Sequence, residues 1–177
     1  MAKKKTAPEL VKDLKQFLEH YIADTAGPPY RHLNAMFQIA PKGAASLLNQ
    51  ALDKRRQYRP ETRCGVLALA VKHGRKDLVD ELIKTVHVSI GEEKEKNSIP
   101  SSSEFFLVSE DAGAYAEYLK LLDAARRLET WGHDNSQHMS FEYTRMLSRL
   151  LPSHPEDHLK RVLVLLESDI LPERVAG

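Results

Sequence analysis

Two pairs of histidines have spacings at which imidazoles can share a metal ion or a proton. His133 and His138 enclose the polar stretch DNSQ, and His154 and His158 stand four residues apart, which places both on one face of a helix. Pro155 follows His154 where a zinc protease has glutamate, and it sets His154 at or before a helix start. We therefore predict no metal site, and we keep His133–His138 as a candidate ligand site.

The single thiol, Cys64, is the other group with nucleophilic chemistry. A reactive thiolate needs a histidine or another positive charge in contact with it. Arg63 precedes Cys64 and His73 follows nine residues later, but no feature of the sequence brings them together. Cys64 stands at the edge of an apolar helix, which favours a small buried residue. The phosphate-binding and serine-hydrolase motifs are missing as well, so we predict no catalytic residue and no cofactor.

The composition is that of a folded protein with almost no net charge. Of the 177 residues 42% are hydrophobic and 29% are charged, and 26 Lys and Arg balance 25 Asp and Glu. These values argue against disorder and against a nucleic-acid partner, which would require a basic excess. The single cysteine, the absence of a secretory signal and the lack of a long apolar run predict a soluble, cytoplasmic protein without a membrane span.

Apolar residues at three- and four-residue spacings predict helices along the whole chain. We expect them at about 8–24, 31–40, 43–58, 61–71, 75–88, 103–112, 113–132, 141–151 and 155–168. Residues 89–104 are polar and rich in serine, and they predict a loop. The expected organisation is a disordered N-terminus at 1–7, one helical domain over 8–171 and a C-terminal tail at 172–177.

A similar outline recurs in several of the predicted helical hairpins. Gly74 is followed after four and eight residues by the apolar pairs Leu78-Val79 and Leu82-Ile83, and Gly43 is followed by comparable pairs at the same offsets. Gly113 keeps only the eight-residue offset. Helices of this kind bury their apolar faces by stacking on neighbours. The predicted fold class is all-α, with stacked helical hairpins that are ankyrin-like or α-solenoid-like, and the alternative is an irregular α-helical bundle.

One unit, residues 64–85, resembles the helix–turn–helix of an ankyrin repeat. The segment from Leu67 to Val71 stands where that family has Leu-His-Leu-Ala-Ala, Gly74 matches the glycine between the helices, and Asp77-Leu78-Val79 matches its acidic-Ile-Val. Gly65 and Val66 occupy the Thr and Pro positions of the family's turn. The resemblance implies a protein-interaction module or adaptor. The unit at residues 64–85 also resembles units in proteins that bacteria deliver into host cells, so a bacterial effector is one expectation.

The predicted function is binding of a partner protein in a groove on the stacked hairpins. The resemblance implies that Ala68, Lys72 and Arg75 line this groove. Aromatic and arginine residues dominate interface energetics, which adds the candidates Tyr30, Arg31 and Trp131. The alternative is a small helical enzyme or ligand-binding protein with a site between hairpins near His133–His138. Neither the partner nor the oligomeric state is encoded in a motif.

Overall fold

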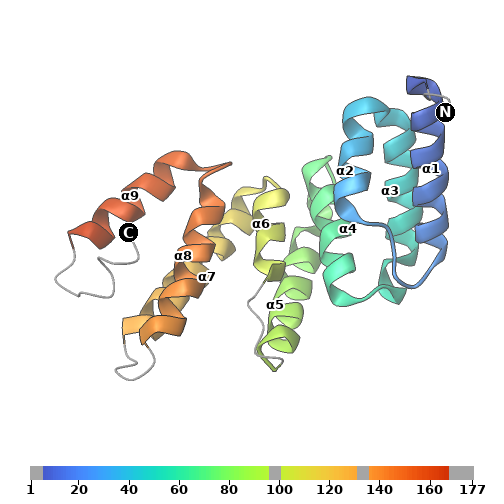
Figure 1. Cartoon of the computed structure of the whole chain (residues 1–177). Coiled ribbons are helices and arrows are strands. Elements are labelled where there is room, and N and C mark those ends of the chain that lie inside the picture. Colours follow the sequence, from blue (N-terminus) through green and yellow to red (C-terminus); the bar gives the residue numbers. More distant parts are fainter. Residues whose placement is uncertain (1–5, 96–100, 131–135, 168–177) are drawn as a thin grey trace. The chain divides into compact units, whose positions relative to one another are not determined.

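The computed structural model describes residues 6–95, 101–130 and 136–167, and all regular structure in these ranges is helical (Figure 1). The predicted all-α class is therefore confirmed. Three short 3-10 turns, Arg55–Gln57, Lys76–Leu78 and Ser101–Ser103, join or extend the helices. The helices are α1 (Ala7–Ala23), α2 (Tyr30–Ile39), α3 (Pro41–Lys54), α4 (Pro60–Lys72), α5 (Val79–Glu95), α6 (Glu104–Val108), α7 (Ala112–Thr130), α8 (Ser136–Leu150) and α9 (Pro155–Leu166).

The chain forms two compact units, Met1–Asp111 and Ala112–Gly177. The first contains α1 to α6 and the second contains α7 to α9. The single domain expected over 8–171 stays a prediction, and each unit is described by itself. The residue ranges 1–5 and 172–177, where we expected a disordered start and a tail, lie outside the described residues.

Helix α5 extends further than the sequence predicted. We expected a polar loop at 89–104, but α5 continues to Glu95, and Ser101–Ser103 and α6 follow. The reason is that Leu82, Val86 and Ile90 form one buried stripe, so Ile90 prolongs the helix into a segment that is otherwise polar. Ser89 is buried on this helix and shares a 2.6 Å hydrogen bond with Ser102.

The turn between α4 and α5 is closed by Gly74. Its φ is +103°, a left-handed conformation that glycine adopts without steric cost. The amide of Gly74 donates to the Val71 carbonyl at 3.1 Å, and that of Arg75 donates to the Ala70 carbonyl at 2.9 Å, which is the Schellman arrangement of a helix C-terminus. Gly43 and Gly113 instead lie within the first turns of α3 and α7, so the three glycines do not share one structural role.

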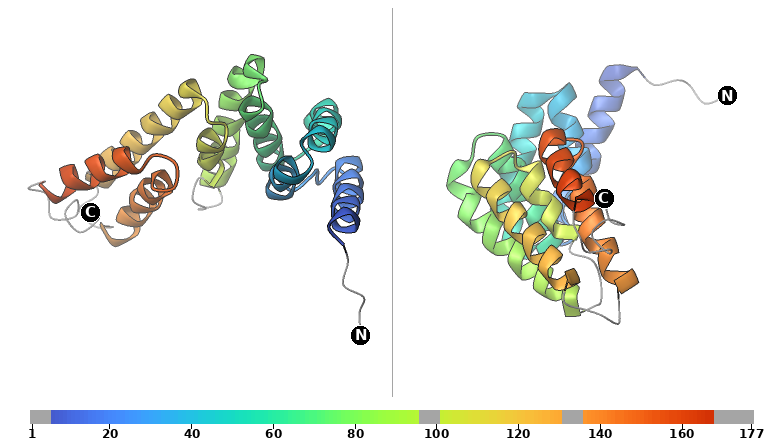
Figure 2. Two further views of the ribbon diagram at one scale, coloured as in Figure 1. Left: turned by 90° about the horizontal axis from the view of Figure 1, so that it is seen from above. Right: turned by 90° about the vertical axis from the view of Figure 1, so that its left-hand side faces the viewer.

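Helix α4 is the centre of the first unit. Every residue from Cys64 to Val71 is buried, because α4 packs against α2, α3, α5 and α6 (Figures 1 and 2). Gly65 lies against the Tyr30 side chain of α2 and the Phe105 ring of α6. One end of α4 meets Phe37, whose ring stacks on His73 with centroids 3.6 Å apart. These contacts mean that α2 and α4 run side by side in the same direction.

Helix α6 also runs parallel to α4. Phe105 meets Gly65 near the start of both helices, and the Lys72 ammonium at the end of α4 lies 2.5 Å from the carboxylate of Glu110, two residues after α6 ends. The neighbouring Lys76 pairs in the same way with Asp111 at 2.7 Å. The first unit therefore contains three parallel helices, α2, α4 and α6, that contact one another along a common direction.

The second unit is held together by α8, which packs against both α7 and α9. The Tyr118 hydroxyl of α7 donates to the Met146 carbonyl of α8 at 2.6 Å, and both residues are buried. Pro155 occupies the first turn of α9, as its missing amide hydrogen allows, and Glu156 and Asp157 add negative charge at this helix N-terminus.

Replacement of Gly65 by alanine tests the close contact between α2, α4 and α6. A Cβ atom at this position would lie 2.8 Å from Tyr30 Cβ and 3.2 Å from Phe105 Cε1, so the helices must move apart. We expect Gly65→Ala to lower the free energy of unfolding by about 1–2 kcal/mol, measured by urea denaturation, because overpacking outweighs the gain in helix propensity.

Gly91→Ala is the matched control, since this helical glycine of α5 has nothing within 4 Å of a new Cβ. It should raise the free energy of unfolding by about 0.5–1 kcal/mol. Equal effects of the two substitutions would contradict the described packing.

Candidate functional site

The residues predicted to line a binding groove have different environments. Ala68 is fully buried within α4, so it presents no surface to a partner, and its place in the predicted groove is wrong. Its small side chain instead lies where α4 is packed on all sides. Trp131 and His133 lie outside the described residues, and His138 falls in α8.

Lys72 and Arg75 are both held in ion pairs. Lys72 keeps only 24% of its side chain exposed and binds Glu110, which has a φ of +52° in the segment after α6. Arg75 donates twice to the Asp77 carboxylate, at 2.9 and 2.8 Å, while about half of its side chain stays exposed. Lys72 therefore joins α4 to the segment after α6, whereas Arg75 remains at the surface.

Tyr30 and Arg31 form one hydrogen-bonded chain with Glu104. The Tyr30 hydroxyl donates to Glu104 at 3.2 Å and accepts from Arg31 Nε at 3.0 Å. The Tyr30 ring meets the edge of Phe105 with centroids 5.0 Å apart, and burial raises the pKa of its phenol. Tyr30 thus joins α2 to α6, and Arg31 is the exposed member of this chain.

The described groups that were considered for metal binding or catalysis form no cluster of three ligands. Among residues 6–95, 101–130 and 136–167 no three His, Cys, Asp or Glu side chains converge as metal ligands would. Cys64 is buried in α4. His154 precedes α9 and stacks on Tyr115 with centroids 4.0 Å apart, which fixes its ring against α7.

The structure shows an exposed apolar surface that the sequence did not reveal. Leu10 and Phe17 of α1 and Ile39 of α2 are 54%, 39% and 56% exposed. Phe17 lies beside His32 of α2, with ring centroids 5.4 Å apart. Because α1 and α2 are antiparallel (Figure 1), Leu10 and Ile39 both lie toward the other end of this pair. We call Leu10, Phe17, His32 and Ile39 the α1–α2 seam.

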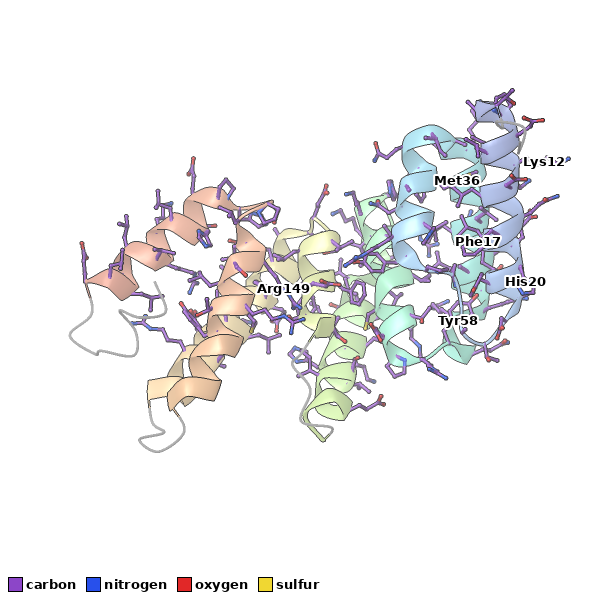
Figure 3. The ribbon with its side chains drawn as sticks, in the orientation of Figure 1. Lys12, Phe17, His20, Met36, Tyr58 and Arg149 are labelled. Atoms are coloured by element: carbon purple, nitrogen blue, oxygen red, sulfur yellow. The ribbon has the colours of Figure 1, made fainter. Side chains whose placement is uncertain are left out.

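The orientation of α1 explains why this seam is exposed. Leu18 and Ile22 are buried, whereas Leu10 and Phe17 lie at one edge of the same apolar arc. Figure 3 shows Phe17 between α1 and α2, and Lys12 and His20 on the side of α1 that faces away from α2. The apolar residues of α1 span about 140° at about 100° per residue, which is wider than one packing face requires. This width is the sequence signal of the seam that our sequence analysis overlooked.

Near the C-terminus of α2, Phe37 and His73 form a flat stack. Their ring planes are 9° apart, and His73 is the residue that ends α4. Burial lowers the pKa of His73, the positive charge of Lys72 lowers it further, and the Glu110 carboxylate acts in the opposite direction. The neutral imidazole is therefore the form that the folded protein favours.

Comparison of the chain with models of protein families, with curated proteins and with solved structures gives no significant match. None of the helices in the described ranges combines the length and the apolar run needed to cross a membrane.

The lowered pKa of His73 predicts a pH dependence of stability. Unfolded His73 binds a proton at its ordinary pKa of 6.5, whereas the folded protein resists protonation. The stabilisation is therefore complete above pH 6.5 and is lost as the pH falls below that value. We expect an NMR titration to give a pKa for His73 below 6.5, and His73→Gln to reduce the rise in stability between about pH 5 and 7. A pKa for His73 at or above 6.5 would contradict this assignment.

Proposed function

We propose that the chain is a protein-interaction module that binds an amphipathic helix of a partner protein on the α1–α2 seam. The observation that carries this proposal is the exposure of three large apolar side chains, Leu10, Phe17 and Ile39, along one helix pair. Several exposed large apolar side chains on one helix pair are typical of interaction sites.

The dimensions of the seam suit a helix. Leu10 and Phe17 are seven residues apart, which is two helical turns or about 10 Å. A partner helix with apolar residues at positions i, i+4 and i+7 presents side chains over the same length. Covering each exposed side chain removes about half of its area from water, which contributes about 1 kcal/mol per residue.

The arrangement of the first unit supports the proposal of an ankyrin-like or other helical-hairpin repeat. Equivalent positions of α2 and α4 are 35 residues apart at Tyr30 and Gly65, and 36 apart at Phe37 and His73. Gly65 of α4 and Phe105 of α6 are 40 residues apart, and Lys72 of α4 and Glu110, which follows α6, are 38 apart. Parallel helices at near-constant separation are what stacking of successive hairpins produces.

Substitution in the seam tests the proposed function. Ile39→Lys and Leu10→Lys place a charge on side chains that are 56% and 54% exposed, so the fold should be retained. Tagged protein is used to capture partners, which are quantified by mass spectrometry, and the affinity of a captured partner is then measured by titration. We expect each seam substitution to lower the affinity for that partner at least about tenfold, because a charge is desolvated in an apolar contact.

Val88→Lys is the matched control, because Val88 is 51% exposed on α5, away from the seam. It should leave the partner bound. Binding through the seam would be refuted if the seam variants and Val88→Lys lost the partner equally, or if all of them retained it. Arg31→Glu and Arg75→Glu then test whether the two exposed cations that the sequence singled out also contact the partner.

A further inference from the structure

Helix α9 exposes its apolar stripe to solvent. Among the described residues nine large hydrophobic side chains are exposed, and four of them belong to this 12-residue helix. Leu159, Leu163 and Leu166 follow one another at spacings of four and three residues, so they lie on one helix face. We call these three leucines the α9 stripe.

The opposite face of α9 attaches it to the second unit. α9 packs against α8, and two polar contacts join it to α7. The Tyr115 hydroxyl of α7 donates to Asp157 at 2.5 Å, and burial together with this hydrogen bond raises the pKa of Tyr115 to about 12. One turn later, Arg161 of α9 donates to Asp123 of α7 at 2.5 Å. Leu165 is the buried apolar residue of this face.

These contacts fix the rotation of α9 about its own axis. At about 100° per residue, Asp157, Arg161 and Leu165 lie on one side of the helix and the α9 stripe lies on another. Rotating α9 to bury the stripe would break both polar contacts to α7. The exposed stripe is therefore a consequence of directional bonds, and not of a loosely attached helix end.

We propose that the α9 stripe binds the α9 stripe of a second copy of this chain, with the two helices antiparallel about a twofold axis near Leu163. A twofold axis brings the same surface patch of both copies together, so a self-complementary stripe is required. Leu159 of one copy then lies near Leu166 of the other, and Leu163 lies against its own equivalent.

The charges beside the stripe are complementary in this arrangement. Lys160 and Glu167 are seven residues apart, on the same edge of the stripe, and both are exposed. In an antiparallel pair, Lys160 of each copy approaches Glu167 of the other, which forms two equivalent ion pairs. Lys160 lies 3.8 Å from Asp157 within its own helix and keeps 72% of its side chain exposed, so it is accessible to a partner.

The interface is small, and the dimer should accordingly be weak. Three leucines and two charged residues per copy bury less area than a standard stable interface, which places the complex among transient ones. We therefore expect a monomer at low concentration and a dimer at high concentration, with dissociation in the micromolar range, on the order of 10–100 µM.

Sedimentation equilibrium of the full chain over a concentration series tests the proposal. The wild-type mass should rise from that of the monomer toward twice that value. Leu163→Lys should abolish the rise, because two lysines would meet at the twofold axis. Val164→Lys is the matched control, since Val164 is 50% and Leu163 is 49% exposed on the same helix, but Val164 lies off the stripe. This variant should dimerise like the wild type.

A charge exchange distinguishes this interface from nonspecific hydrophobic association. Lys160→Glu and Glu167→Lys should each weaken the dimer about threefold to tenfold, because two ion pairs become like-charge contacts. The double variant restores opposite charges across the axis and should recover wild-type dimerisation. A monomer at every concentration, equal loss in Leu163→Lys and Val164→Lys, or no recovery in the double variant would overturn the proposal.

Discussion

The close approach of helices at Gly65 is the contact on which the first unit depends. Because this residue has no side chain, Tyr30 of α2 and Phe105 of α6 both reach the backbone of α4. The parallel alignment of the three helices follows, and the stack of Phe37 on His73 and the ion pair of Lys72 with Glu110 complete it at the other end. α4 is thus surrounded, and its chemistry-poor composition of Cys, Gly, Val, Leu and Ala is what such a position requires.

The sequence predicted the helices well, because helix formation follows from apolar spacing and from local end signals such as Pro155 and Gly74. It failed where the result depends on which neighbours cover a helix. Ala68 was expected at a surface, but α4 is covered on every side. Leu10 and Phe17 belong to the apolar stripe of α1, yet only the Leu18 and Ile22 edge of that stripe is buried.

Segment 89–104 is another place where the structure differs from the prediction made from sequence. Its polar composition predicted a loop, but a single apolar residue in register, Ile90, is sufficient to continue α5.

The role of a charged residue also differs between the prediction and the structure. The resemblance implied that Lys72 lines a binding groove, but the structure places it in an ion pair with Glu110, because only the fold brings these two residues together. Long-range pairing of this kind has no signature in a single sequence.

The two units share one physical feature, which is that polar or aromatic contacts fix a helix while part of its apolar surface stays in water. In the first unit Phe17 meets His32 at the α1–α2 seam, and in the second Asp157 and Arg161 hold α9 with its stripe exposed. Exposed apolar area on well-packed helices costs solubility, and it is favourable only when another chain covers it. The proposed binding role rests on this feature of the architecture.

Site-specific photo-crosslinking in cells that produce the protein tests this central claim most directly. A benzophenone amino acid would replace Ile39 in the seam in one variant, and Val88 on α5 in the other, two positions of similar exposure. The account predicts a discrete protein adduct from position 39 that is missing from position 88. Equal adducts from both positions, or none from position 39, would contradict it.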